Sequence, residues 1–130
     1  MTDTAQIRKN LEYYIAKVPV KKTPAMSKSV YSVLYARLGE AEQALHYFYD
    51  SYLPNLNPPF RVIAEFNGGT NPYFITGAGG TLQAIIFGFA GLEITDKGLK
   101  QVYTPILPEE WSSLTIRVAG KEIVHVNKNE

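Results

Sequence analysis

Cysteine is absent from the sequence, which excludes disulfide bonds, thiolate zinc sites and a cysteine nucleophile and leaves the redox compartment undetermined. An excess of charge of one sign is lacking too, because 13 Lys and Arg oppose 12 Asp and Glu for a net charge of +1. No basic stripe or block of like charge is present, so neither nucleic acid nor an anionic membrane is expected as a partner.

Long apolar segments are also lacking. The longest apolar run, Leu82 to Leu92, contains two glycines and is too short to span a bilayer. The first ten residues hold no apolar h-region, so no signal peptide is expected within this chain and the compartment stays unknown. The only histidines, His46 and His125, are far apart with no carboxylate pattern around them, so neither a metal site nor a cofactor is expected.

What is present indicates one globular domain, since 130 residues with 45% hydrophobic content can bury a core but not two. Apolar periodicity and helix-breaking residues predict three helices. The first is capped by Asp3 or Thr4 and ends at about Val18, the second runs from Pro24 to Leu38, and the third runs from Glu40 to about Leu53. We expect Gly39 to end the second helix and to allow an antiparallel hairpin with the third. The expected inner positions of the first two helices are Ile7, Leu11, Tyr14, Ile15 and Val18, then Met26, Val30, Val33, Leu34 and Leu38.

A fourth helix is expected over residues 81–89, introduced by Thr76-Gly77-Ala78-Gly79-Gly80. This helix is apolar almost all round, a pattern typical of a helix buried on every side. Short β-rich segments separated by turn residues follow, at 92–95, 98–103, 114–118 and 122–126. The pattern predicts an α+β fold, with a helical part at residues 1–91 and a small antiparallel β-sheet domain at residues 92–130.

The stretch that looks most like a site runs from Phe60 to Gly91. Glu65 lies near the end of a short apolar run, and a loop rich in Gly, Asn and Pro follows it before the expected helix start. A carboxylate beside mobile glycines and free helix N–H groups suits a polar ligand. Two plainer interpretations stand beside this one: Glu65 as a surface residue at a strand end, and the glycines as tight packing of helix against loop.

Three segments carry a resemblance to a known family: TPAMSKSVYSVLYARLGEAEQALHYFYDSYLPNLNPPF, AEFNGGTNPYFITGAGGTLQAIIFGFAGLEIT and PILPEEWSSLTIRV. Together they resemble the C-terminal part of glycoside hydrolase family 65, which includes acid-trehalase-like and other α-glucoside hydrolases as well as disaccharide phosphorylases. The similarity extends from about Asp3 to Val126, and NGGTNPYFITGAGG followed by an apolar helix is its most specific part.

The resemblance implies that the helices are the last of an (α/α)6 barrel and that the strands form the small domain after it. It implies an inverting α-glucoside hydrolase in which Glu65 is the general base and Asn71, Thr76 and Gly77 belong to the sugar pocket. The general acid would come from an earlier barrel helix, so this chain alone is expected to be inactive. The implied partners are an α-glucoside, the remainder of the parent enzyme and, through exposed apolar surface, a second copy.

Two alternatives to this reading stay open. One is a non-catalytic α+β interaction module that binds another chain through an apolar face. The other is a fragment of a disaccharide phosphorylase, a group in which the resemblance implies that a histidine helps to bind phosphate near this loop. No histidine lies between His46 and His125, and Glu65 would repel phosphate, so the sequence favours a hydrolase.

Overall fold

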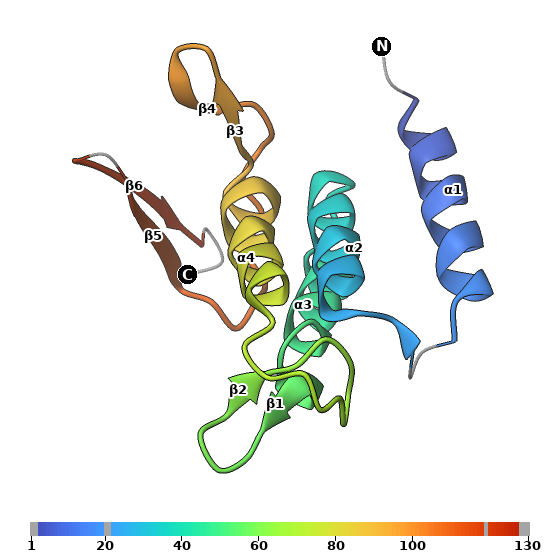
Figure 1. Ribbon diagram of the computed structural model, residues 1–130. Coiled ribbons are helices and arrows are strands. Elements are labelled where there is room, and N and C mark those ends of the chain that lie inside the picture. The colour runs from blue at the N-terminus through green and yellow to red at the C-terminus, as the bar shows by residue number, and fades with distance from the viewer. Residues whose placement is uncertain (1–2, 20–21, 119, 128–130) are drawn as a thin grey trace.

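The computed structural model describes residues 3–19, 22–118 and 120–127, and within them helices precede most strands (Figure 1). The order is α1 (Thr4–Lys17), α2 (Ala25–Arg37), α3 (Ala41–Asp50), η2 (Leu53–Asn55), β1 (Leu56–Asn57), β2 (Val62–Ile63), α4 (Ile75–Gln83), η3 (Ala84–Phe89), β3 (Leu92–Thr95), β4 (Gly98–Gln101), β5 (Ser113–Val118) and β6 (Lys121–Val126). Here η2 is a 3-10 turn and η3 a π-helical continuation of α4. This content confirms the α+β class.

Helices α2 and α3 form the predicted antiparallel hairpin. Gly39 adopts a φ of 83°, the left-handed conformation that commonly follows a helix C-terminus. The Ser32 hydroxyl donates to the Ala44 carbonyl at 2.7 Å, and the Lys28 ammonium lies 3.2 Å from the Asp50 carboxylate. The pairing of an early α2 residue with a late α3 residue shows that the two helices run in opposite directions.

The inner face of α2 differs from the prediction. Met26 and Val30 are 45% and 46% exposed, whereas the buried positions are Ala25, Lys28, Ser29, Ser32, Tyr35 and Ala36. This difference arises because α4 and η3 pack side by side with α2 and run parallel to it (Figure 1). Gly77, Gly80 and Gly88 face α2 at this contact. Small residues on both sides allow this close approach, so the larger apolar residues of α2 are turned outward.

Helix α1 begins as predicted but buries little. The Asp3 carboxylate caps it by accepting from the Ala5 amide at 2.9 Å, and an ion pair joins Arg8 to Glu40 on the α3 side. Of the expected stripe, Leu11 is buried, whereas Tyr14 is well exposed. Only part of the apolar stripe of α1 is therefore buried against the other described residues.

The fourth helix starts earlier than predicted and is not covered on all sides. Residues 76–80, expected to introduce the helix, already belong to α4, which begins at Ile75. Ala84, Gly88 and Phe89 are buried, but Leu82 is 60% exposed. The Phe89 ring contacts Trp111, with ring centroids 4.7 Å apart. Trp111 thus packs between the helices and the β5–β6 strands.

The strands after η3 form two separate antiparallel hairpins instead of one sheet. In β3–β4, Leu92 pairs with Gln101, and in β5–β6, Ser113 pairs with Val126. The segment between them crosses to the helices, where Ile106 donates its amide to the Phe89 carbonyl at 2.9 Å. This segment therefore separates the β3–β4 hairpin from the β5–β6 hairpin along the chain.

The side chains of β6 have the opposite orientation to the one predicted. The alternation of Val124, His125 and Val126 in the sequence predicts a strand on which His125 faces solvent. In the structure His125 is half-buried, and burial lowers its pKa. Its neighbours Val124 and Val126 are exposed instead. The alternation of inward and outward side chains is present, but with the opposite phase.

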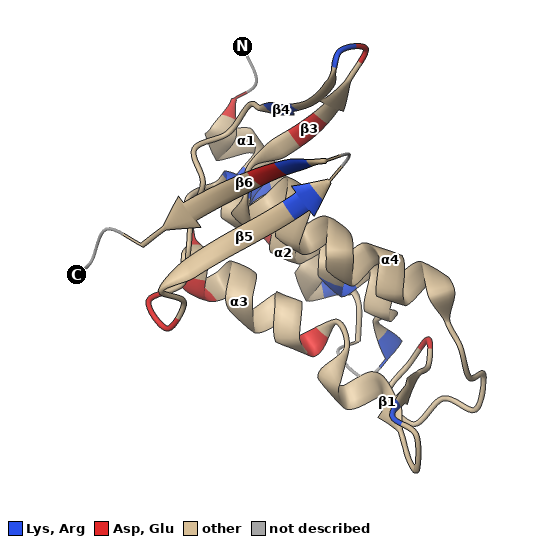
Figure 2. Ribbon diagram, turned by 90° about the vertical axis from the view of Figure 1, so that its left-hand side faces the viewer, with Lys and Arg blue, Asp and Glu red and all other residues tan. Residues whose placement is uncertain are grey.

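Basic and acidic residues alternate along the ribbon in Figure 2, without one extended region of a single sign. Ion pairs join several of them, among them Arg37–Glu93 and Arg117–Glu122. Among the described residues, none of the helices combines the length and the hydropathy that crossing a membrane requires.

Candidate functional site around Glu65

The peptide of Glu65 is held at three points by residues from three parts of the chain. Its carbonyl accepts from the Ala25 amide, at the first turn of α2, over 3.0 Å. The same carbonyl accepts from the side-chain amide of Asn55 at 3.1 Å. On the other side, the Glu65 amide donates to the Asn71 side-chain oxygen at 3.4 Å. The backbone at this position is therefore fixed against the helical scaffold.

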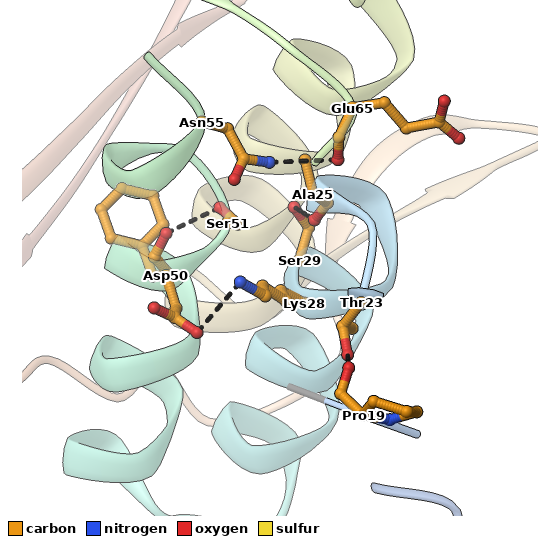
Figure 3. A network of polar contacts seen from close by, with 10 residues as sticks. Pro19, Thr23, Ala25, Lys28, Ser29, Asp50, Ser51, Asn55 and Glu65 are labelled. Atoms are coloured by element: carbon orange, nitrogen blue, oxygen red, sulfur yellow. Dashed lines mark hydrogen bonds and ion pairs between the residues drawn. The ribbon is translucent and has the colours of Figure 1, made fainter. Parts of the chain in front are cut away.

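The Glu65 carboxylate points away from this network. Figure 3 shows the side chain leaving the polar cluster of Asn55, Ala25 and Ser29 and extending outward. The Asn71 side-chain amide donates to Oε2 at 3.3 Å, and no ion pair engages Glu65 within the described residues. The result is a carboxylate on a fixed backbone with capacity left to accept a proton or a hydrogen bond.

The glycine loop that follows, residues 67–73, is also held in place by hydrogen bonds. The Asn57 side chain donates to the Gly69 carbonyl at 2.6 Å, and the Gly69 amide donates to the Phe66 carbonyl at 2.9 Å. At the loop's end, Tyr73 has a φ of 61° and an exposed side chain. Left-handed backbone is uncommon outside glycine, so the loop conformation is strongly specified by its surroundings.

The structure brings together only some of the four predicted site residues, which are Glu65, Asn71, Thr76 and Gly77. Glu65 and Asn71 are in contact, while Thr76 lies exposed in the first turn of α4. Gly77 is buried, and its amide donates to the Phe74 carbonyl at 3.1 Å. A Cβ at Gly77 would lie 2.8 Å from Phe74 Cδ1 and 3.1 Å from Ala25 Cβ, so this glycine serves the packing of α4 on α2. A contact of Thr76 or Gly77 with sugar stays a prediction.

We expect Gly77→Ala to lower the free energy of unfolding by about 1–3 kcal/mol, because the added methyl overpacks the contact with Phe74 and Ala25. Gly79 is the matched control, since nothing lies within 4 Å of a Cβ built there. Gly79→Ala should raise stability by about 0.5–1 kcal/mol through helix propensity. Urea unfolding of both variants checks the pair, and equal effects would show that packing does not distinguish the two glycines.

Asn55 is the functional candidate that sequence reasoning missed. It ends η2, is completely buried, and bonds to the Glu65 peptide through its side chain and to the Ala64 amide through its carbonyl. The available signal was a pair of asparagines within the proline-rich run Pro54-Asn55-Leu56-Asn57-Pro58. Both donate their side-chain amides to backbone carbonyls of the site segment.

The other acidic and histidine side chains of the described residues do not gather at Glu65. Among the described residues no cluster of three or more His, Cys, Asp or Glu could hold a metal ion. Asp50 and Glu40 are engaged in ion pairs, and the Tyr49 hydroxyl donates to Glu110 at 2.5 Å. A depression of about 460 Å³ lies elsewhere, between residues 104–107 and residues 124–127.

No family model matches the chain, but several characterised proteins do. It is 53% identical over 122 residues to the kojibiose hydrolase of Mucilaginibacter mallensis and 55% identical over 123 residues to that of Flavobacterium johnsoniae. Each match covers 94% of this chain and 18% of the relative. The α,α-trehalose phosphorylase of Geobacillus stearothermophilus is 31% identical over 124 residues, covering 93% of this chain and 15% of that protein.

The chain thus spans about a fifth or less of the length of the relatives that it matches. These relatives include hydrolases and phosphorylases of one family, as the motifs around Glu65 indicated. Over nearly its whole length, the chain is similar to the C-terminal region of proteins of glycoside hydrolase family 65.

Proposed function

We propose that this chain supplies part of the active site of an inverting hydrolase of α-linked glucosides, with Glu65 as the general base. Inversion requires a second carboxyl group as general acid, roughly 6.5–9.5 Å from the base, so that a water fits between base and sugar. Asn71, Thr76 and Gly77 would belong to the sugar pocket. The acid would come from a barrel segment outside this chain.

The observation that carries the proposal is the contrast between the Glu65 backbone and its carboxylate. The carbonyl accepts two hydrogen bonds from the scaffold, while the side chain extends away from it (Figure 3). A general base needs this combination, because proton transfer requires a carboxylate held at a fixed place and yet free to contact water. The identity to proteins named kojibiose hydrolase supports hydrolysis of a glucoside.

The helices also suit a place in an (α/α)6 barrel, with residues 92–130 forming a small domain after it. Helices α2 and α4 run parallel with the antiparallel α3 between them in sequence, which is the alternation that such a barrel requires. The outward Met26, Val30 and Leu82 would then contact the remainder of the barrel.

The distinction between hydrolase and phosphorylase is tested by products. The longer protein that the proposal requires is incubated with a panel of α-linked glucosyl disaccharides, with and without inorganic phosphate. We expect two free sugars at a rate independent of phosphate, and no turnover by the 130-residue chain alone. Formation of glucose phosphate only when phosphate is present would overturn the hydrolase assignment in favour of a phosphorylase.

If the chain is prepared alone, we expect self-association, because the apolar side of α2 and α4 is then uncovered. Sedimentation velocity should show a sedimentation coefficient that rises with protein concentration. Met26→Gln together with Val30→Gln should weaken this dependence, whereas Val126→Gln on the exposed side of β6 should not. A monomer at every concentration would contradict the expectation.

A further inference from the structure

Asn55 contacts the site segment at two successive residues. Its side-chain amide donates to the Glu65 carbonyl at 3.1 Å, and its own carbonyl accepts from the Ala64 amide at 2.8 Å. The residue is 0% exposed, so water does not compete for these bonds. Asn55 therefore forms hydrogen bonds with the backbone on both sides of the Ala64–Glu65 peptide bond.

The oxygen of the Asn55 side-chain amide, Oδ1, does not stabilise the structure through a hydrogen bond. It is buried and has no hydrogen-bond partner among the described residues. An unpartnered buried acceptor is unfavourable, and an apolar side chain of similar size would avoid that cost. Within the part of the chain that the structure describes, the one polar contact of the side chain is the bond from Nδ2 to the Glu65 carbonyl.

We infer that Asn55 is a positioning residue for Glu65, acting on the general base through its backbone carbonyl. The inference rests on the proposed function. Without the amide of Asn55, the Glu65 carbonyl keeps only the bond from Ala25, which comes from the α2 side. The segment then stays joined to η2 only through the Ala64 amide, which still donates to the Asn55 carbonyl. The Glu65 carbonyl can shift about that point, and the carboxylate moves with it relative to the attacking water.

The test is a double-mutant cycle on turnover in the longer enzyme, with Asn55→Leu and Glu65→Gln alone and combined. Positional errors of about 1 Å can cost on the order of 100-fold in rate, so Asn55→Leu should lower kcat by about 10- to 100-fold, with KM unchanged. In the Glu65→Gln background the same substitution should change kcat less than about twofold, because the base through which Asn55 acts is already lost.

Asn127→Ser is the matched control, because the Asn127 side chain also donates to backbone carbonyls, those of Pro108 and Trp111, away from Glu65. It should have the same small effect in both backgrounds. Asn55→Ser, with a shorter side chain, repeats the cycle if Asn55→Leu gives no soluble enzyme.

Equal losses from the Asn55 substitutions in both backgrounds would overturn the inference, as would unchanged kcat or failure of both variants to fold, since each assigns Asn55 a purely structural role or none. Failure of the proposed function is a different result. In that case Glu65→Gln by itself leaves kcat at the wild-type value.

Discussion

Replacement of Glu65 by glutamine is expected to lower kcat for α-glucoside hydrolysis by about 10²–10⁴-fold, the usual contribution of a general base. Glutamine keeps the length and shape of the side chain, and its amide oxygen can still accept from Asn71. It cannot take a proton from the attacking water. Steady-state kinetics of the longer enzyme should therefore show a loss confined to kcat, with KM close to that of the wild type.

The control is Glu109→Gln, which removes a carboxylate from an exposed position in the segment before Trp111. It should leave kcat and KM unchanged, because Glu109 is remote from the Glu65 network. A kcat for Glu65→Gln within about twofold of the wild type would return Glu65 to an ordinary surface carboxylate. The contacts around it would then serve packing.

The second large effect concerns stability, at the junction between η3 and β3. Gly91 has a φ of 66°, and a Cβ placed there would overlap the carbonyl oxygen of Tyr103. The Gly91 carbonyl also accepts the amides of Val102 and Tyr103, each at 3.0 Å, so the two backbones cannot separate without losing both bonds. Gly91→Ala should lower the free energy of unfolding by about 3 kcal/mol or more, combining overpacking with left-handed backbone strain.

Gly98 separates the two causes of that loss. It also has a positive φ, of 91°, but nothing lies within 4 Å of a Cβ built there. Gly98→Ala should therefore cost only the backbone term, about 1–2 kcal/mol. Thermal and denaturant unfolding of the two variants measures the difference, and equal destabilisation would show that the approach of Tyr103 is not responsible.

Elements specified by local patterns could be predicted from the sequence. The α2–α3 hairpin followed from periodicity and from Gly39. Strands β3 and β4 followed from short β-rich segments that turn residues separate. The position of Glu65 beside a glycine loop was visible in the same way. The proposal that it acts as a base came from the resemblance and not from the residues alone.

The features that escaped prediction depend on contacts between distant residues. Glycines disfavour helix, so residues 76–80 were expected to precede the fourth helix. Packing of Gly77 and Gly80 against Ala25 and Ser29 outweighs that preference. The same contact turns the expected inner face of α2 outward. Asn55 follows no periodicity, because its partner lies ten residues later on a segment that only the β1–β2 turn brings back.

The central claim, that Glu65 activates water on the face of the sugar opposite the leaving group, is tested most directly by the stereochemistry of the first product. Proton NMR of an α-linked disaccharide treated with the longer enzyme should show β-glucose first, before mutarotation, and Glu65→Gln should abolish that signal. Release of α-glucose first by the wild-type enzyme would contradict the account, because retention needs a nucleophilic carboxylate and not a base.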